Sequence, residues 1–285
     1  MPLPMPMPMP VPVPVPVPLP LPLPLPMPPP IPMPMPPPPP IPMPPPPPIP
    51  LPPPLPATAR AVVPTGPSRM SHVLRSELIA TARAMHADGL APGTSGNVSA
   101  RTRAGLLITP SGVPYDALAP SDLCELDAHG EVVGPHRLPP SSEWRLHLGV
   151  YAARPEVAAI VHTHSRFATT LSTLRRDLPA VHYMIAVAGG PTVRCARYAT
   201  YGTAALAEAA AEALVDRLAC LLANHGLVAL GASLPAALRV AREIEIVAEQ
   251  YLRALQVGQP FVLPDEEIAL VVDKFKSYGP RDPRR

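Results

Sequence analysis

Residues 158–164 read Ala-Ala-Ile-Val-His-Thr-His, and this stretch carries both a strong strand signal and a strong site signal. The apolar residues 158–161 predict a short buried strand that runs directly into His162 and His164. Side chains two positions apart on a strand point to the same side, so both imidazoles face one point. Two ligands of one metal ion require this arrangement, although an isolated His-x-His pair is more often two ordinary hydrogen-bonded histidines.

A second apolar run ends in the same way farther along the chain. Residues 220–223 predict a strand that is followed by Asn224-His225-Gly226, and residues 228–230 either continue this strand or pair with it. The glycine allows a tight turn beside a site. If the two strand ends are neighbours in one sheet, His162, His164 and His225 can face the same ion. Three histidines with an open fourth position are typical of a catalytic zinc site.

Helical patterns lie between the predicted strands. Apolar residues from Val73 to Met85 keep helical spacing, and Gly89 provides a stop. Further helices are expected from Ser141-Ser142 to near Pro155, from Thr203 to about Arg217, from Ser233 onward, and from near Asp265 to the region 275–278. Additional strands are expected at Val98 and at 106–108. Helices that alternate with strands predict an α/β domain in which helices cover a central sheet.

Glu143 is the candidate general base. It lies in the first turn of a predicted helix, where free amides and the helix dipole favour an anion, so an acid that only complements the dipole is the alternative interpretation. Three short segments suit a phosphate group because they offer hydroxyls and exposed backbone amides. They are Gly93-Thr94-Ser95-Gly96-Asn97, Thr109-Pro110-Ser111-Gly112 and the Ser141-Ser142 pair.

Taken in order, these segments resemble the class II aldolase/adducin family. The resemblance is carried by seven stretches that span nearly all of residues 57–285 and none of residues 1–56: GTSGNVS at 93–99, ITPSGVPY at 108–115, LPPSSEWR at 138–145, HTH at 162–164, HYMIA at 182–186, NHG at 224–226 and FKSYG at 275–279. It implies a single three-layer αβα domain with a central, mainly antiparallel sheet.

The resemblance also implies roles for individual residues. His162, His164 and His225 would bind one zinc ion per subunit, and Glu143 would both ligate the metal and take the carbon-bound proton. Tyr183, reaching in from a neighbouring subunit, would handle the proton on the aldehyde oxygen, and Tyr278 would belong to a mobile segment that closes over the site. The phosphate would be held by Thr94, Gly96, Asn97, Ser111, Gly112, Ser141 and Ser142.

The implied activity is reversible cleavage of a ketose 1-phosphate, with L-fuculose 1-phosphate as the first candidate, into dihydroxyacetone phosphate and L-lactaldehyde. Three alternatives stay open: a pentulose-phosphate 4-epimerase of the same fold, a non-catalytic adducin-like interaction module, and an enzyme of this family that dehydrates a thio-sugar phosphate. Glu143 argues against the epimerases, which typically carry aspartate there, and the complete set of three histidines argues against the module. The family further implies a homotetramer with active sites at subunit boundaries.

Composition divides the chain into two parts. Residues 1–56 contain 34 of the 51 prolines and none of the 44 charged side chains, which predicts a disordered or polyproline II tail that cannot form a helix or a membrane span. A proline-binding partner for this tail is possible, but a simple spacer is favoured. The remaining 229 residues suit one domain, and a net charge of +2 argues against a nucleic-acid binder. Cys124, Cys195 and Cys220 show no pairing pattern, which favours reduced thiols and a cytoplasmic location.

Overall fold

The computed structural model describes residues 69–277 of the chain. The Pro-rich segment 1–56, its predicted boundary with the domain and the predicted C-terminal residue Tyr278 lie outside this range. Within it, a single mixed sheet has the strand order β3-β2-β1-β4-β7-β6-β5. The strands are β1 (Asn97–Arg101), β2 (Gly105–Ile108), β3 (Cys124–Asp127), β4 (Ala159–Thr163), β5 (Arg194–Ala196), β6 (Ala219–Leu222) and β7 (Gly226–Gly231).

All strand pairs are antiparallel except β5 with β6, so the expected mainly antiparallel sheet is confirmed for the described residues. The structure also settles the question that the sequence left open at residues 228–230. They belong to β7, which pairs with β6 and does not continue it. Asn224 adopts a left-handed conformation with φ of 55°, which asparagine tolerates better than most residues, and this reverses the chain between the two strands.

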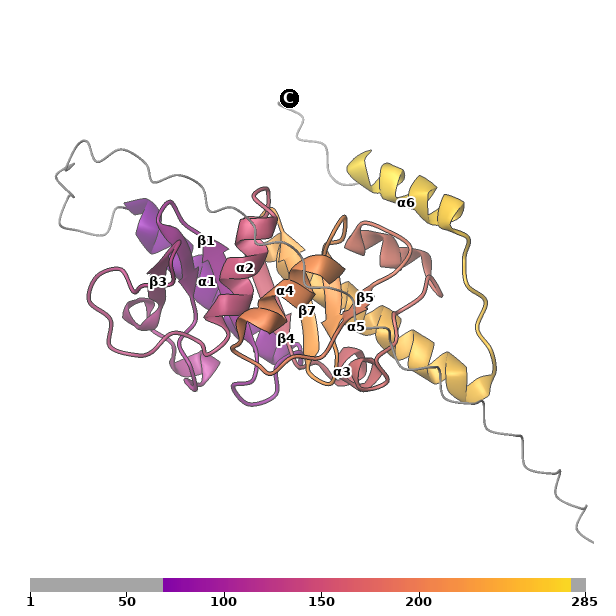
Figure 1. Ribbon diagram of the computed structural model, residues 1–285, viewed down its shortest axis with the longest axis horizontal. Helices are drawn as coiled ribbons and strands as arrows, with labels where there is room; N and C mark the ends of the chain where they lie inside the picture. Colours follow the sequence, from indigo (N-terminus) through magenta and orange to yellow (C-terminus); the bar gives the residue numbers. More distant parts are fainter. Residues whose placement is uncertain (1–68, 278–285) are drawn as a thin grey trace, which may run out of the picture. The chain divides into compact units, whose positions relative to one another are not determined.

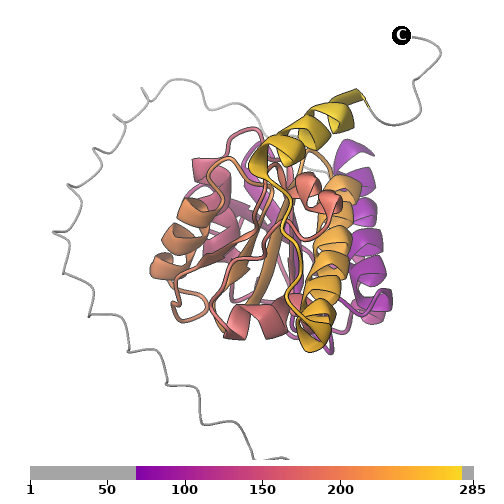
Figure 2. The same ribbon diagram turned by 90° about the vertical axis from the view of Figure 1, so that its right-hand side faces the viewer.

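Helices cover both faces of the sheet (Figure 1). They are α1 (Arg69–Ala87), α2 (Trp144–Ala153), α3 (Arg166–Thr173), α4 (Ala204–Ala213), α5 (Leu234–Val257) and α6 (Asp265–Ser277), with short 3-10 turns η1 (Tyr115–Ala117), η2 (Pro120–Asp122) and η3 (Tyr183–Ala188). Figure 2 shows α2 and α4 on one side of the sheet and α1 and α5 on the other. Each layer has its own apolar core, because alternate strand residues such as Ile160 and Val161 point to opposite faces. The predicted three-layer αβα domain is therefore confirmed.

The helix ends follow local capping signals, with two differences from the sequence expectation. Thr203 and Ser233 accept backbone N–H groups at the starts of α4 and α5 as predicted. However, α4 ends at Ala213 and not near Arg217, because side chains from distant parts of the fold bind the carbonyl groups there, among them Arg194 to Ala213 O. Helix α2 has Glu143 itself at its N-cap, and the Ser141 hydroxyl accepts the Glu143 amide.

None of the helices in the described part of the chain is both long and apolar enough to cross a membrane.

Candidate metal centre and active site

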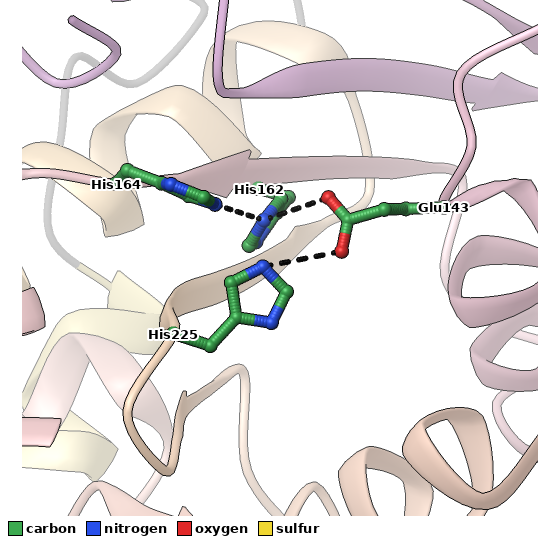
Figure 3. Close-up of side chains that lie close together, drawn as sticks. All are labelled: Glu143, His162, His164 and His225. Carbon is green, nitrogen blue, oxygen red and sulfur yellow. Dashed lines mark hydrogen bonds and ion pairs between the residues drawn. The ribbon is translucent and has the colours of Figure 1, made fainter. Parts of the chain in front are cut away.

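Four side chains from three separate parts of the chain meet at one end of the sheet (Figure 3). Their potential ligand atoms all lie within 4.8 Å of one another, and they belong to Glu143, His162, His164 and His225. Nε2 of His162 is 3.0 Å from Oε2 of Glu143 and 3.1 Å from Nε2 of His164, and Nε2 of His225 is 3.2 Å from Oε1 of Glu143. The structure thus brings together the three histidines and the carboxylate predicted from the sequence.

Strand register explains why the histidines meet. In the β4–β7 pair, His162 lies opposite Val228 and Thr163 lies opposite Leu227, so the end of β4 reaches the turn that carries His225. Gly226 is required in that turn because a Cβ atom there would lie 2.3 Å from the Thr163 carbonyl oxygen. Glu143 comes from the helical layer that covers this face of the sheet, at the N-terminus of α2.

Hydrogen bonding fixes the orientation of His162. Its Nδ1 lies 3.0 Å from the Leu227 carbonyl oxygen, which can only accept a hydrogen bond, so Nδ1 carries the hydrogen. Nε2 therefore faces the cluster, as in metal sites where a backbone carbonyl orients a histidine ligand.

The charges in the cluster are strongly coupled. Burial disfavours the ionised form of Glu143, but the charge and hydrogen bonds of His162, followed by those of His225, outweigh burial and hold the pKa of Glu143 far below its usual range. In turn, burial would lower the pKa of His162, but the Glu143 carboxylate raises it. Burial and the charges of His162 and His225 lower the pKa of His164 to about 4, which keeps it neutral near neutral pH. The carboxylate stays ionised and can hold a cation.

The four ligand atoms fit a divalent metal ion. Three imidazole nitrogens and one carboxylate oxygen form a donor set that zinc accepts, and bonds of about 2.1 Å to a tetrahedral ion would separate its ligands by about 3.4 Å. The three separations given above, two of which run to different oxygens of Glu143, are only slightly shorter. Oε1 of Glu143 is also buried, and among the described residues no hydrogen bond supplements the 3.2 Å approach of His225 Nε2, so a cation between these two atoms would satisfy both.

A pocket of about 360 Å³ opens over the cluster. Glu143, His164 and His225 form part of its wall, as do Thr94 and Ser142 from the predicted phosphate segments. The other members of that set lie behind or beside it. Ser111 N donates to Pro139 O and Ser141 N donates to Thr109 O, so these two predicted segments run side by side. Ser111 and Gly112 are exposed, whereas Gly96, Asn97 and Ser141 are buried.

A sequence model of the class II aldolase and adducin N-terminal domain matches residues 76–252 of this chain. The chain belongs to the class II aldolase and adducin family. It is 50% identical over 206 residues to a 5-methylthioribulose-1-phosphate/5-deoxyribulose-1-phosphate aldolase of Rhodospirillum rubrum, covering 72% of this chain and 92% of the relative. It is 47% identical over 209 residues to the L-fuculose phosphate aldolase of Escherichia coli K12, covering 73% and 96%.

Solved structures agree with this assignment. An L-fuculose 1-phosphate aldolase structure superposes with a TM-score of 0.69 at 45% identity, over 72% of this chain and 96% of that one. The fold, the family and the catalytic class of this protein are therefore those of a class II aldolase, a carbon–carbon lyase.

Two tyrosines at the mouth of the aldolase pocket were not identified from the sequence. Tyr198 and Tyr201 line the pocket and are 55% and 63% exposed. They lie in the segment between β5 and α4, and nothing in their local sequence indicates that this segment passes over the histidines. By contrast, Tyr183 is 49% exposed at the start of η3 and does not line the pocket of its own chain.

The connection of Asn97 and His147 to the site was likewise not predicted from the sequence. Asn97 Nδ2 donates to Oε2 of Glu143 at 3.0 Å, and the Asn97 amide oxygen accepts from His147. The signal is present as two periodic polar sets, Asn97-x-Ser99-x-Arg101 on a strand and Glu143-x3-His147-x3-Tyr151 on a helix. These two sets indicate a hydrogen-bonded network only once it is known that this helix packs on this face of the strand.

Proposed function

We propose that this aldolase uses one zinc ion per subunit to cleave a ketose 1-phosphate reversibly into dihydroxyacetone phosphate and an aldehyde. L-Fuculose 1-phosphate, which yields L-lactaldehyde, is the first candidate substrate. The observation that carries the proposal is the cluster of Glu143 with His162, His164 and His225, facing a pocket beside hydroxyl-rich loops.

We assign phosphate binding, metal binding and proton transfer to different residues in and beside the pocket. Thr94, Ser142 and the adjoining loop 109–112 supply hydroxyls and amides for the phosphate. The three histidines and Glu143 would hold the ion, which supplies positive charge to offset the negative charge that develops on the substrate oxygens. In the synthetic direction Glu143 removes a proton from the hydroxymethyl carbon of dihydroxyacetone phosphate, and in cleavage it returns that proton to carbon.

The aldehyde end of the substrate is the variable part. The relative from R. rubrum is named for 5-methylthioribulose 1-phosphate and 5-deoxyribulose 1-phosphate, and its 50% identity makes these sugars the second candidates. All three ketose 1-phosphates share the carbons that become dihydroxyacetone phosphate. They differ in the aldehyde fragment, which in our proposal lies nearer to Tyr198 and Tyr201 at the pocket mouth.

Two other functions known for this fold predict different assay results. A 4-epimerase would interconvert pentulose phosphates without releasing dihydroxyacetone phosphate. An adducin-like interaction module would bind no metal, but the four ligand side chains present here argue against it.

Purified full-length protein, assayed with the three ketose phosphates, tests the proposal. Cleavage is followed as released dihydroxyacetone phosphate, reduced by a coupled dehydrogenase. We expect release from at least one sugar, loss of release on chelation, recovery with zinc, and a loss of about 100-fold or more for Glu143→Ala. Cleavage that survives both the chelator and the substitution would refute the proposed chemistry.

The proposal includes assembly and location. In a homotetramer, Tyr183 would enter the pocket of a neighbouring subunit, and its exposure outside its own pocket supports this role. Tyr278 would close over the site from the C-terminal segment. The unpaired Cys124, Cys195 and Cys220 support a reducing compartment, the cytoplasm.

A further inference from the structure

A ladder of polar side chains runs between β1 and α2, directly behind the Glu143 carboxylate. Strand β1 contributes every second residue and α2 contributes every fourth, so that each set forms a row on one face of its element. The two rows interdigitate, in the order Glu143, Asn97, His147, Ser99, Tyr151 and Arg101.

The hydrogen bonds in this ladder have a defined direction. Because the Glu143 carboxylate can only accept, the Asn97 N–H group donates to Oε2, and the Asn97 carbonyl oxygen faces His147. That oxygen requires a hydrogen on Nε2 of His147, so Nδ1 of the neutral ring accepts from the Ser99 hydroxyl at 2.6 Å. The Ser99 oxygen then accepts from the Tyr151 hydroxyl at 2.9 Å. Every donor points toward the carboxylate.

Burial makes this direction hard to reverse. Ser99 and His147 are fully buried, and Asn97 and Tyr151 are only 4% and 3% exposed. A reversed amide or a different tautomer would leave buried donors facing donors, which is costly in the absence of water. Burial also lowers the pKa of His147 to about 3, so the ring stays neutral near pH 7. Desolvation raises the pKa of Tyr151, which therefore stays a donor.

The ladder distinguishes the two oxygens of Glu143. Oε2 receives the Asn97 N–H group and lies 3.0 Å from Nε2 of His162. Oε1 receives no hydrogen bond from the ladder, and among the described residues it faces Nε2 of His225 at 3.2 Å. A carboxylate that is held on one oxygen presents the other in a fixed position.

We propose that His147 is a positioning residue for the aldolase reaction. As the neutral Nε2–H tautomer, it holds the Asn97 amide with its N–H group toward Oε2 of Glu143, so that Oε1 is the oxygen that exchanges the substrate proton. This proposal rests on the proposed role of Glu143 as the base. The His147 ring itself touches neither the carboxylate nor the pocket wall.

A matched pair of variants separates hydrogen bonding from packing. In His147→Gln, the side-chain amide places an N–H group close to the position of Nε2, whereas His147→Leu fills the space without a donor and leaves the Asn97 amide free to turn. We expect His147→Leu to lower kcat by about 100-fold with little change in KM, because the base is misplaced. The kcat of His147→Gln should be at least about tenfold higher than that of His147→Leu, since a donor is restored.

Zinc affinity gives a readout that does not depend on turnover. In competition with a chromogenic chelator, the leucine variant should bind zinc about tenfold more weakly than the wild type, and the glutamine variant should lie close to the wild type. Long-range proton–nitrogen spectra of histidine-labelled protein report the tautomer directly. The ring whose signals vanish in His147→Gln should show the Nε2–H pattern.

The outcomes are distinct. Equal kcat for the two variants, wild-type kcat in His147→Leu, or an Nδ1–H or charged ring in the wild type would overturn the proposal. If the wild type cleaves no ketose phosphate, the proposed function fails, while the zinc and tautomer measurements still test the hydrogen-bond direction in the ladder.

If His147→Leu does not fold, Ser99→Ala and Tyr151→Phe replace it. Ser99→Ala, which unpairs Nδ1, should then lower kcat more than Tyr151→Phe, and the reverse order would overturn the proposal.

Discussion

Replacing Gly226 by alanine should damage the metal centre through a single steric contact. The added Cβ would lie 2.3 Å from the Thr163 carbonyl oxygen, 3.2 Å from Cδ2 of His164 and 3.3 Å from Cε1 of His162. To restore even a 3.0 Å contact, the β7 turn and the end of β4 must separate by at least 0.7 Å, the difference between that limit and 2.3 Å. Metal–ligand distances tolerate only about 0.2 Å, so this movement cannot be absorbed at the ligands.

The expected magnitudes follow from that displacement. A misplacement of about 1 Å costs about 100-fold in rate, so kcat/KM should fall by about that factor, with weaker zinc binding. Overpacking of this kind costs about 1–3 kcal/mol, which lowers Tm by about 2–12 °C in a domain of this size. Gly258→Ala is the control, because a Cβ at Gly258 meets no atom within 4 Å. Chelator competition, steady-state kinetics and thermal unfolding check the pair. Wild-type zinc affinity and wild-type kcat/KM in Gly226→Ala would contradict this prediction.

Three further predictions concern other parts of the chain. His147 has a folded pKa of about 3 against 6.5 for an ordinary histidine, so its contribution to stability is complete above pH 6.5 and is lost as the pH falls toward 3. Between pH 7 and pH 5 the loss is about 2 kcal/mol, and urea unfolding of metal-free protein should show a smaller decrease for His147→Gln. Glu245→Gln should destabilise the protein by about 1 kcal/mol in the same assay, because the Glu245 carboxylate accepts from Ser165 and from two amides at the start of α3, whereas Glu249→Gln should have little effect. Deleting residues 1–56 should leave kcat and KM unchanged, and a large loss of turnover would show that this segment does more than act as a spacer.

Local sequence patterns predicted most of the elements but fewer of their contacts. Strand β4 could be predicted because the residues before His162, 158–161, are all apolar. They are apolar because β4 is buried between two helical layers. The partner of residues 228–230 was not predictable by the same means, since a continued strand and a hairpin have the same apolar pattern. The end of α4 was predicted too late because arginine side chains from elsewhere in the fold bind the carbonyls at its end.

The candidate site was predicted unevenly for a similar reason. His162 and His164 are two residues apart, so strand periodicity alone places them together. Glu143 is 19 residues away from His162 and could be linked to it only through resemblance to the family. Asn97 was assigned to the phosphate from that resemblance. Its amide hydrogen bonds to Glu143 and His147 depend on the packing of α2 against β1, which sequence periodicity does not specify.

The same packing links the register of the sheet to the chemistry of the site. Asn97 lies opposite His162 in the β1–β4 pair, so the residue that holds the carboxylate and a predicted metal ligand share one row. A slip of β1 by one residue would turn Asn97 and Ser99 toward the apolar layer beneath α1 and α5, and would place Val98 against His147. Each buried polar group left unpaired in this way costs about 1–3 kcal/mol. The polar ladder therefore opposes the slip as the apolar cores do, and selection for a fixed Glu143 carboxylate also selects for the correct sheet.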